Sequence, residues 1–286
     1  MTNRPRNTTE PLVTVIVTTK NNHATLHACL RSIALQTYPC VELIVVDNNS
    51  TDDTKAIAKR FTKLVFNQGP ERSVQRNFGV QHAHGQYIMI IDSDMELQET
   101  VVAACVQKVL AEPDVQAIII PEESFGEGFW AQCKRLERSF YVGADHIEAA
   151  RFFPKQLYQR LGGYNPSMTG GEDWDLTNRV RATGRVDRVQ PYIFHNEGHP
   201  RFTRTVRKVY YYAQHAVEYF AENPATSALT HKSGPLARYK LFFSRPGKLF
   251  KNPFLGAGMI TLKTAEYAAG GAGYWQAKRQ AKRGRS

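Results

Sequence analysis

Short apolar runs rich in β-branched residues alternate, along the first hundred residues, with segments whose apolar residues repeat at helical spacing. The runs predict buried strands, because a strand covered on both faces needs apolar side chains at nearly every position. The predicted strands are residues 12–18, 41–46, 63–66 and 87–91. The segments between them predict helices at residues 23–36, 54–61 and 71–83. This alternation predicts an α/β fold with a mostly parallel, Rossmann-like sheet covered by helices.

The alternation continues beyond residue 92 with less regular units. Strands are predicted at residues 115–120 and 186–194, and an edge strand at residues 149–154 is expected to bring Arg151 toward the end of the sheet. Helices are predicted at residues 97–110, 129–140, 172–182 and 203–223. The expected core of the α/β domain therefore extends to about residue 200.

Three of the predicted strands end in clusters of polar residues. The clusters are residues 18–21, 47–50 and 92–94, and the last reads Asp92-Ser93-Asp94. Ligands bind outside the carboxyl ends of the strands in open parallel sheets, so the three clusters are expected to share one site. Two carboxylates beside a buried strand are costly without a partner, and their oxygens suit Mg²⁺ or Mn²⁺ bridging to a phosphate. The alternative is a polar turn, in which Asp and Ser are favoured.

The positive charge of the chain is concentrated in its last third. Residues 201–286 hold 16 Lys/Arg and three Asp/Glu, and the whole chain has a formal net charge of +11. This asymmetry favours an anionic partner, either a membrane or a nucleic acid. The alternative is a basic tail that is simply solvated.

Length, cysteine content and the N-terminal residues narrow the class of protein. A chain of 286 residues can hold one large α/β domain and an appendage. The four cysteines have neither paired nor zinc-type spacing, which is typical of reduced thiols in a cytosolic protein. Residues 1–11 have no apolar core, so we expect a disordered arm and no secretory signal.

Five segments in a fixed order carry a family resemblance. They are VTVIVTTKNN, VELIVVDNNSTDDT, RNFGVQHAHGQYIMIIDSDMEL, LGGYNPSMTGGEDWDLTNRV and IFHNEG. Together they resemble the inverting glycosyltransferases of family 2, which have the GT-A fold, over about residues 13–198. The family often has Pro-Thr-Tyr-Asn at residues 18–21 and Asp-Asp-Gly-Ser at residues 47–50, where this chain has Thr-Thr-Lys-Asn and Asp-Asn-Asn-Ser. These departures bear on the nucleotide base and leave the metal motif intact.

The resemblance implies a site for the nucleotide part of a nucleotide-diphosphate sugar. Thr19, Lys20 and Asp47 are expected to contact the nucleoside. Arg76 is expected to approach the pyrophosphate, where charge-assisted hydrogen bonds are strong. Asp92 is expected to reach the ribose or to orient the site. The alternatives are a turn-capping role for Asp47 and a surface position for Arg76.

The resemblance also implies the metal and the catalytic base. Asp94 is expected to ligate Mn²⁺ or Mg²⁺, which would neutralise charge on the leaving nucleoside diphosphate. His195 is expected to complete the metal shell or to contact a phosphate, unless it is structural. Asp173 matches the general base that takes a proton from the acceptor hydroxyl. Glu172 and Trp174 are expected to bind substrate, the indole as an apolar face for the acceptor. The alternatives are an acidic helix N-terminus without chemistry for Glu172 and Asp173, and a core aromatic for Trp174.

The C-terminal third reads as a helical basic extension that associates with a membrane. Residues 235–254 mix basic and aromatic residues, a composition that suits an anionic lipid interface. Residues 255–275 are apolar, but Lys263 and Glu266 interrupt them near the middle, which favours an interfacial or packed helix over a spanning one. The predicted domains are an arm at residues 1–11, a GT-A catalytic domain at 12–200 and the extension at 201–286.

We therefore expect a metal-dependent inverting glycosyltransferase of cell-envelope biogenesis that lies in the cytoplasm, peripherally on the inner face of the membrane. Its donor would be a nucleotide-diphosphate sugar, and its acceptor a lipid-linked saccharide or another envelope precursor. A metal-dependent nucleotidyltransferase is the alternative enzyme. The alternatives without this activity are a nucleic-acid-binding protein that uses the basic third and an idle relative that binds sugars or scaffolds a complex. Because carboxylates at the site repel phosphates unless a metal intervenes, no nucleic acid is expected as a partner.

Overall fold

A computed structural model describes residues 10–145, 147–168, 170–222 and 234–283. Residues 1–9 of the predicted N-terminal arm lie outside the described residues. The chain divides into two compact units. The first contains the described residues up to Glu122, together with Ala149–Pro166 and Glu172–Asn196, and the second contains the rest. Residues 123–148 therefore belong to the same unit as the C-terminal third.

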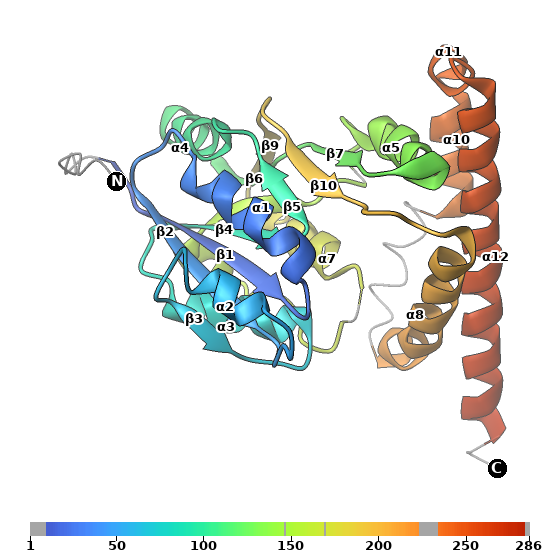
Figure 1. The fold of residues 1–286 in the computed structure, drawn as a ribbon, viewed down its shortest axis with the longest axis horizontal. Helices are drawn as coiled ribbons and strands as arrows, with labels where there is room; N and C mark the ends of the chain where they lie inside the picture. The colour runs from blue at the N-terminus through green and yellow to red at the C-terminus, as the bar shows by residue number, and fades with distance from the viewer. Residues whose placement is uncertain (1–9, 146, 169, 223–233, 284–286) are drawn as a thin grey trace. The chain divides into compact units, whose positions relative to one another are not determined.

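A seven-stranded sheet forms the centre of the first unit (Figure 1). Its order is β3-β2-β1-β4-β8-β6-β9. The strands are β1 (Val13–Thr19), β2 (Val41–Asp47), β3 (Val65–Asn67), β4 (Tyr87–Asp92), β6 (Val115–Ile119), β8 (Ala150–Pro154) and β9 (Arg185–Arg188). All neighbouring pairs are parallel except those that β8 makes with β4 and β6. The predicted mostly parallel sheet is confirmed.

Helices cover both faces of this sheet. They are α1 (His23–Ala34), α2 (Thr54–Ala58), α3 (Arg72–His82), α4 (Val101–Ala111), α6 (Lys155–Arg160) and α7 (Glu172–Arg181). In β1, Val15 and Val17 pack into the core cluster that contains residues of α1 and α4, whereas Ile16 packs into the cluster with α3, α6 and α7. Alternate side chains of a strand point to opposite faces. The uninterrupted apolar runs therefore arise because each face of the sheet has its own buried core.

The predicted edge strand at residues 149–154 is wrong in its position. The corresponding strand, β8, lies inside the sheet between β4 and β6 and is antiparallel to both. Its adjacent residues Phe152 and Phe153 are fully buried in the two different core clusters. An internal strand buries both faces, and this pair of aromatic residues satisfies that requirement. The direction of β8 is not encoded in its apolar pattern.

The predicted single strand at residues 186–194 is two strands in two sheets. Arg185–Arg188 forms β9 in the large sheet, and Ile193–Asn196 forms β10, which pairs antiparallel with β5 (Met95–Leu97). Pro191 lies between them and has no amide hydrogen for a sheet ladder. The helix predicted from residue 97 accordingly begins later, at Val101, because residues 95–97 are extended. The smaller sheet has the order β5-β10-β7, and β7 (Glu122–Phe125) leads the chain out of the first unit.

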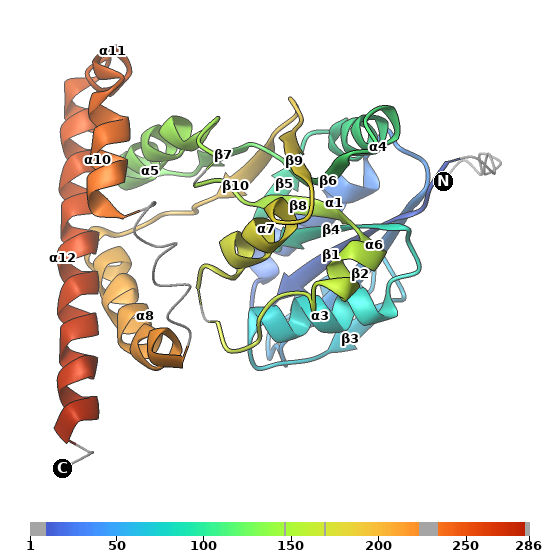
Figure 2. The same cartoon turned by 180° about the vertical axis from the view of Figure 1, so that it is seen from behind.

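The second unit is built from helices. These are α5 (Gly128–Tyr141), α8 (Phe202–Glu222), α10 (Pro235–Phe243), α11 (Pro246–Leu249) and α12 (Pro253–Arg283). Figures 1 and 2 both show α8 alongside the long helix α12. Cys133 and Phe140 of α5 form a buried core with Phe242 of α10, Leu249 of α11 and Met259 of α12.

Two charged residues inside the apolar stretch of α12 are buried in ion pairs. The Lys263 amine lies 2.7 Å from Glu137 Oε1 and 2.5 Å from Glu266 Oε2. Burial by itself raises the pKa of Glu137, but the Lys263 charge and its hydrogen bonds outweigh this and lower the pKa. Lys263 thus joins α12 to α5, as expected of a packed helix. Among the described residues, no helix is long and apolar enough to cross a membrane.

Candidate functional site

The carboxyl ends of β1, β2 and β4 bring the three predicted polar clusters together. In the parallel register Thr19 lies opposite Asp47, and Thr18 lies opposite Asp92. The hydroxyl of Thr18 donates to Asp92 Oδ1 at 3.3 Å. This edge of the sheet, the carboxyl edge, is where ligands bind in open α/β sheets. The sequence therefore located the edge correctly from strand ends alone.

Arg76 lies at the centre of this edge and is fully buried. Its guanidinium NH2 is 2.8 Å from Asp92 Oδ1, and its NH1 is 2.9 Å from Asp173 Oδ1 and 3.1 Å from Glu172 Oε1. The Tyr164 ring stacks on the same group, with 4.9 Å between its centroid and Arg76 Cζ. We call Arg76 with Asp92, Glu172 and Asp173 the arginine hub. It ties α3 to the end of β4 and to the first turn of α7.

The electrostatics of the hub keep Arg76 and Asp92 charged. Burial opposes both charges, but the carboxylates of Asp173, Asp92 and Glu172 raise the pKa of Arg76 well above its ordinary value. In the same way, the charge of Arg76, followed by that of Arg151, lowers the pKa of Asp92 despite burial. Charge-assisted pairs in a buried site are strong because water does not screen them. The expected contact of Arg76 with a pyrophosphate stays a prediction, and the structure adds a second task, which is to hold carboxylates.

Asp173 and Glu172 occupy the same helical turn but differ in accessibility. The Asp173 side chain is 27% exposed, whereas that of Glu172 is 5% exposed. Burial, followed by the neighbouring charge of Asp173, raises the pKa of Glu172. A group that takes a proton from an incoming hydroxyl must be reachable from solvent. Of the two carboxylates, Asp173 meets this requirement. Glu172 is buried and forms an ion pair with Arg76.

Asp94 and His195 form a second pair beside the hub. His195 Nε2 lies 3.4 Å from Asp94 Oδ2, because β10 pairs with β5 so that His195 stands opposite Met95. His195 lies within β10 and not after a strand, as the sequence had indicated. Its other ring nitrogen, Nδ1, is 3.7 Å from Glu122 Oε2. The structure brings the two residues together, and their predicted role as metal ligands stays a prediction.

The chemistry of this pair fits Mn²⁺ or Mg²⁺. The Asp94 side chain is 39% exposed, whereas Asp92 is turned inward to its arginines and is 17% exposed. The described residues include no group of three His, Cys, Asp or Glu that could enclose a metal ion. Mg²⁺ is commonly held by one or two protein carboxylates, with phosphate oxygens and water filling the other positions. The Asp94 carboxylate at this open edge matches that arrangement, and the His195 imidazole beside it would add a nitrogen ligand.

Glu122 is a site residue that the sequence analysis missed. Its Oε1 accepts a hydrogen bond from Arg151 Nε at 2.7 Å, and its Oε2 faces His195. Arg151 NH1 is in turn 3.8 Å from Asp92 Oδ2, so Arg151 reaches the site as predicted. Glu122 therefore links Arg151 to His195. A signal was present, since Glu122 is the first charged residue after the strand at residues 115–120, where the other clusters stand.

The side chain of Asp47 is engaged by its own turn. Ser50 donates its backbone N–H to Asp47 Oδ1 at 2.7 Å and its hydroxyl to Oδ2 at 2.5 Å. Asn49 has φ of 51°, a left-handed conformation that Asn tolerates better than most residues. The family often has glycine at this position, and Asn49 adopts the left-handed conformation there. Asp47 performs the capping role that was the alternative, and its contact with a nucleoside stays a prediction.

Thr19 carries a buried polar atom with no protein partner. Its hydroxyl oxygen is buried and has no hydrogen-bond partner within the described part of the chain. Its backbone carbonyl accepts from Asn48 N and from the Gln75 side chain, which fixes the strand end. A buried hydroxyl without a partner is costly. The expected contacts of Thr19 and Lys20 with a nucleoside stay predictions. Lys20 is exposed, and Trp174 on α7 is half-buried.

Comparisons with known proteins agree with this geometry. The family described as Glycosyl transferase family 2 matches residues 14–170. A PGL/p-HBAD biosynthesis glycosyltransferase of Mycobacterium bovis is 29% identical over 178 residues, which are 59% of this chain and 69% of that protein. A GalNAc(5)-diNAcBac-PP-undecaprenol beta-1,3-glucosyltransferase of Campylobacter jejuni is 32% identical over 108 residues, 34% of each chain.

The fold is also that of a solved glycosyltransferase. A mannosyltransferase of Pyrobaculum calidifontis in complex with GDP-Man and Mn²⁺ superposes with a TM-score of 0.58 at 20% sequence identity. The match covers 94% of this chain and 88% of that chain. At this identity the likeness establishes the fold alone, and it confirms the expected GT-A architecture.

We predict that Arg76→Met destabilises the protein strongly. The substitution leaves three carboxylates facing one another without their cation, which typically costs about 3–5 kcal/mol in a buried pair. Urea unfolding measures the loss. Arg72→Met is the control, because Arg72 is exposed and lies 3.8 Å from Glu172, so it should cost less than about 1 kcal/mol. Equal losses of unfolding free energy in the two variants would contradict the stabilising role of the arginine hub.

The same variants should differ in their response to acid. Arg76 holds the pKa of Asp92 below its ordinary value. The stability that this pair contributes is therefore present above about pH 4 and is lost as the pH falls toward the folded value. Arg76→Met should lose less stability on acidification than the parent protein and the Arg72→Met control.

Proposed function

Because the chain belongs to glycosyl transferase family 2, we propose that it transfers a sugar from a nucleotide-diphosphate sugar to an acceptor hydroxyl with inversion, using Asp173 as general base. The observation that carries this proposal is the arginine hub. A buried guanidinium holds one partly exposed carboxylate, Asp173, at the carboxyl edge where Asp94 and His195 also lie. The family match gives no support to the nucleotidyltransferase and nucleic-acid-binding alternatives.

In the proposed reaction, Asp173 accepts the proton of the acceptor hydroxyl as its oxygen bonds to the anomeric carbon. The bond from that carbon to the diphosphate breaks on the opposite side, which inverts the configuration. Arg76 fixes the orientation of Asp173 through the contact at 2.9 Å, so the base is positioned before the acceptor arrives. The hub also keeps the carboxylate beside a positive charge.

Asp94 and His195 would hold the divalent cation, Mn²⁺ or Mg²⁺. When bound, the cation supplies positive charge to the leaving diphosphate. The chain's own part is to set the pair at the carboxyl edge, which the antiparallel pairing of β5 and β10 achieves. The nucleoside would be bound by Thr19, whose hydroxyl has no partner among the described residues, together with Lys20 and Asp47. Trp174 would contact the acceptor.

The exposed residues of the second unit support the proposal that the acceptor lies at an anionic membrane surface. Its segment from α10 to the start of α12 exposes large apolar residues, including Leu236 at 87% and Phe254 at 80%. We call the exposed apolar and cationic residues of this segment the amphipathic patch; they are Leu236, Lys240, Phe243, Arg245, Phe250, Lys251 and Phe254. Apolar side chains among cations suit the boundary between anionic headgroups and acyl chains. The Campylobacter relative, whose name gives an undecaprenol-linked saccharide, fits a lipid-linked acceptor for this chain.

We predict that Asp173→Asn lowers kcat by about 10²–10⁴, because the amide cannot take the proton. Donor binding should persist, since Asn keeps the shape of the side chain. Asp175→Asn is the matched control on the same helix, where the carboxylate pairs with Arg179 at 2.6 Å. The product's anomeric configuration, read by NMR, tests inversion. Undiminished kcat in Asp173→Asn would remove Asp173 from the mechanism.

Asp94→Ala should abolish the effect of Mn²⁺ on donor binding. A nucleotide sugar at about 100 times its Kd stabilises the folded state by roughly 2.7 kcal/mol, which raises Tm by several degrees. We expect one donor of a panel to give this shift only with Mn²⁺, and Asp94→Ala to show none. Glu99→Ala, a nearby exposed acid, is the control. A full shift in Asp94→Ala would exclude the metal role of Asp94.

Phe250→Ser with Phe254→Ser should weaken binding to vesicles that contain anionic phosphatidylglycerol by at least about tenfold. Each exposed aromatic side chain that enters the interface contributes roughly 1–2 kcal/mol through burial of its apolar area. Flotation with liposomes measures the bound fraction. Leu35→Ser with Leu110→Ser, two exposed apolar residues of the first unit, is the control. Equal binding by both double variants would refute the patch.

A further inference from the structure

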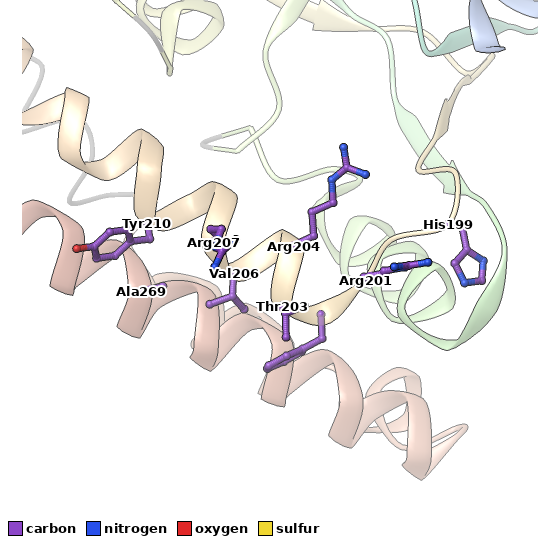
Figure 3. A pocket seen from close by; sticks show the side chains of 9 residues that line it. His199, Arg201, Thr203, Arg204, Val206, Arg207, Tyr210 and Ala269 are labelled. Carbon is purple, nitrogen blue, oxygen red and sulfur yellow. The ribbon is translucent and has the colours of Figure 1, made fainter.

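A groove of about 960 Å³ runs between α8 and α12 in the second unit (Figure 3). Its cationic side is formed by Arg201, Arg204 and Arg207. Its apolar side is formed by Phe202 and Val206 of α8 and Ala269 of α12. The two sides differ in chemistry, so an occupant should itself be part charged and part apolar.

Within the described part of the chain, the three arginines of this groove have no carboxylate partner, unlike several other arginines. No carboxylate of the described residues pairs with Arg201, Arg204 or Arg207, and the described lining residues include no acid. By contrast, exposed Arg185 contacts three carboxylates, and buried Arg76 contacts three more. Cations that line one groove without a described counter-charge favour the binding of an anion there. Their planar forks match phosphate oxygens in particular.

The groove continues along the same two helices beyond Tyr210. A second hollow of about 410 Å³ is lined by Tyr210, which the two hollows share, and by residues of α12: Ala272, Trp275, Gln276, Arg279 and Gln280. Trp275 is 62% exposed, which is unusual for so large an apolar ring. The surface therefore passes from three arginines at the start of α8 to a hollow in which the Tyr210 and Trp275 rings lie with glutamines and with Arg279, whose Cζ is 4.9 Å from the centroid of the Trp275 ring. An elongated amphiphile fits this order better than a compact anion.

We propose that this groove binds a phosphate-linked lipid, with the phosphate at Arg204 and Arg207 and the chain along Tyr210 and Trp275. The inference rests on the proposed function, because such a lipid would be the carrier of the acceptor saccharide. The groove recognises the phosphate by paired hydrogen bonds and the chain by apolar contact. It is distinct from the amphipathic patch, none of whose residues line it.

The test compares three probes on the full chain: inorganic pyrophosphate, neutral phosphatidylcholine vesicles that carry a polyprenyl diphosphate, and the same vesicles with equal charge supplied by phosphatidylglycerol. We expect the polyprenyl diphosphate vesicles to bind at least about tenfold tighter than the phosphatidylglycerol vesicles. Arg204→Gln with Arg207→Gln should abolish this preference. Lys59→Gln with Arg60→Gln removes the same charge from the exposed surface of the first unit and should keep it.

Each other outcome overturns the proposal. Equal binding of both kinds of vesicle would mean that general charge attraction acts, and an unchanged preference in the arginine variant would place the site elsewhere. Pyrophosphate that binds as tightly as the lipid would show a site for free phosphate. Trp275→Ser should weaken the lipid probe and leave pyrophosphate unaffected. The Mn²⁺-dependent donor shift, measured on the same variants, reports separately on the proposed function, so the two failures are distinguishable.

Discussion

The first unit depends on compensation of one buried positive charge. Arg76 is fully buried, and a guanidinium in that position is tolerated only when carboxylates face it. Asp92 comes from the end of β4, and Glu172 and Asp173 come from the start of α7. The requirement therefore fixes three elements at once, and the proposed base inherits its position from a buried ion pair and not from a mobile loop.

The two acids of the Asp-Ser-Asp motif divide the work because their surroundings differ. Asp92 ends β4 and turns toward Arg76 and Arg151, which keep it ionised by lowering its pKa against the effect of burial. Asp94 lies in the turn beyond, is more exposed and faces His195. A cation at Asp94 would not have to compensate Asp92 as well, since arginines already do so. The carboxylate that is paired with arginines and the more exposed carboxylate thus stay separate, although only one residue lies between them.

The sequence was informative where the physics is local. The strands β1, β2 and β4 and the polar clusters after them follow from apolar runs and their ends, and Asp94 with His195 followed from motif resemblance. The partners of Arg76 could not be read in this way, because Asp173 is 97 positions away and the ion pair exists only after folding. The direction of β8 was equally hidden, since a fully buried strand has the same pattern whether it runs parallel or antiparallel.

The basic C-terminal third shows that net charge predicts function only after the cations paired within the protein have been separated from the others. Lys263 looked like an expensive charge in an apolar helix, yet Glu137 and Glu266 neutralise it, so it acts as a structural link. Arg204 and Arg207 lie on α8, the helix beside α12, and no described carboxylate pairs with them. Only cations without a carboxylate partner attract an external anion, because paired cations are already compensated within the protein. The positive charge of residues 201–286 is therefore better judged by the groove arginines, which have no carboxylate partner among the described residues, than by its sum.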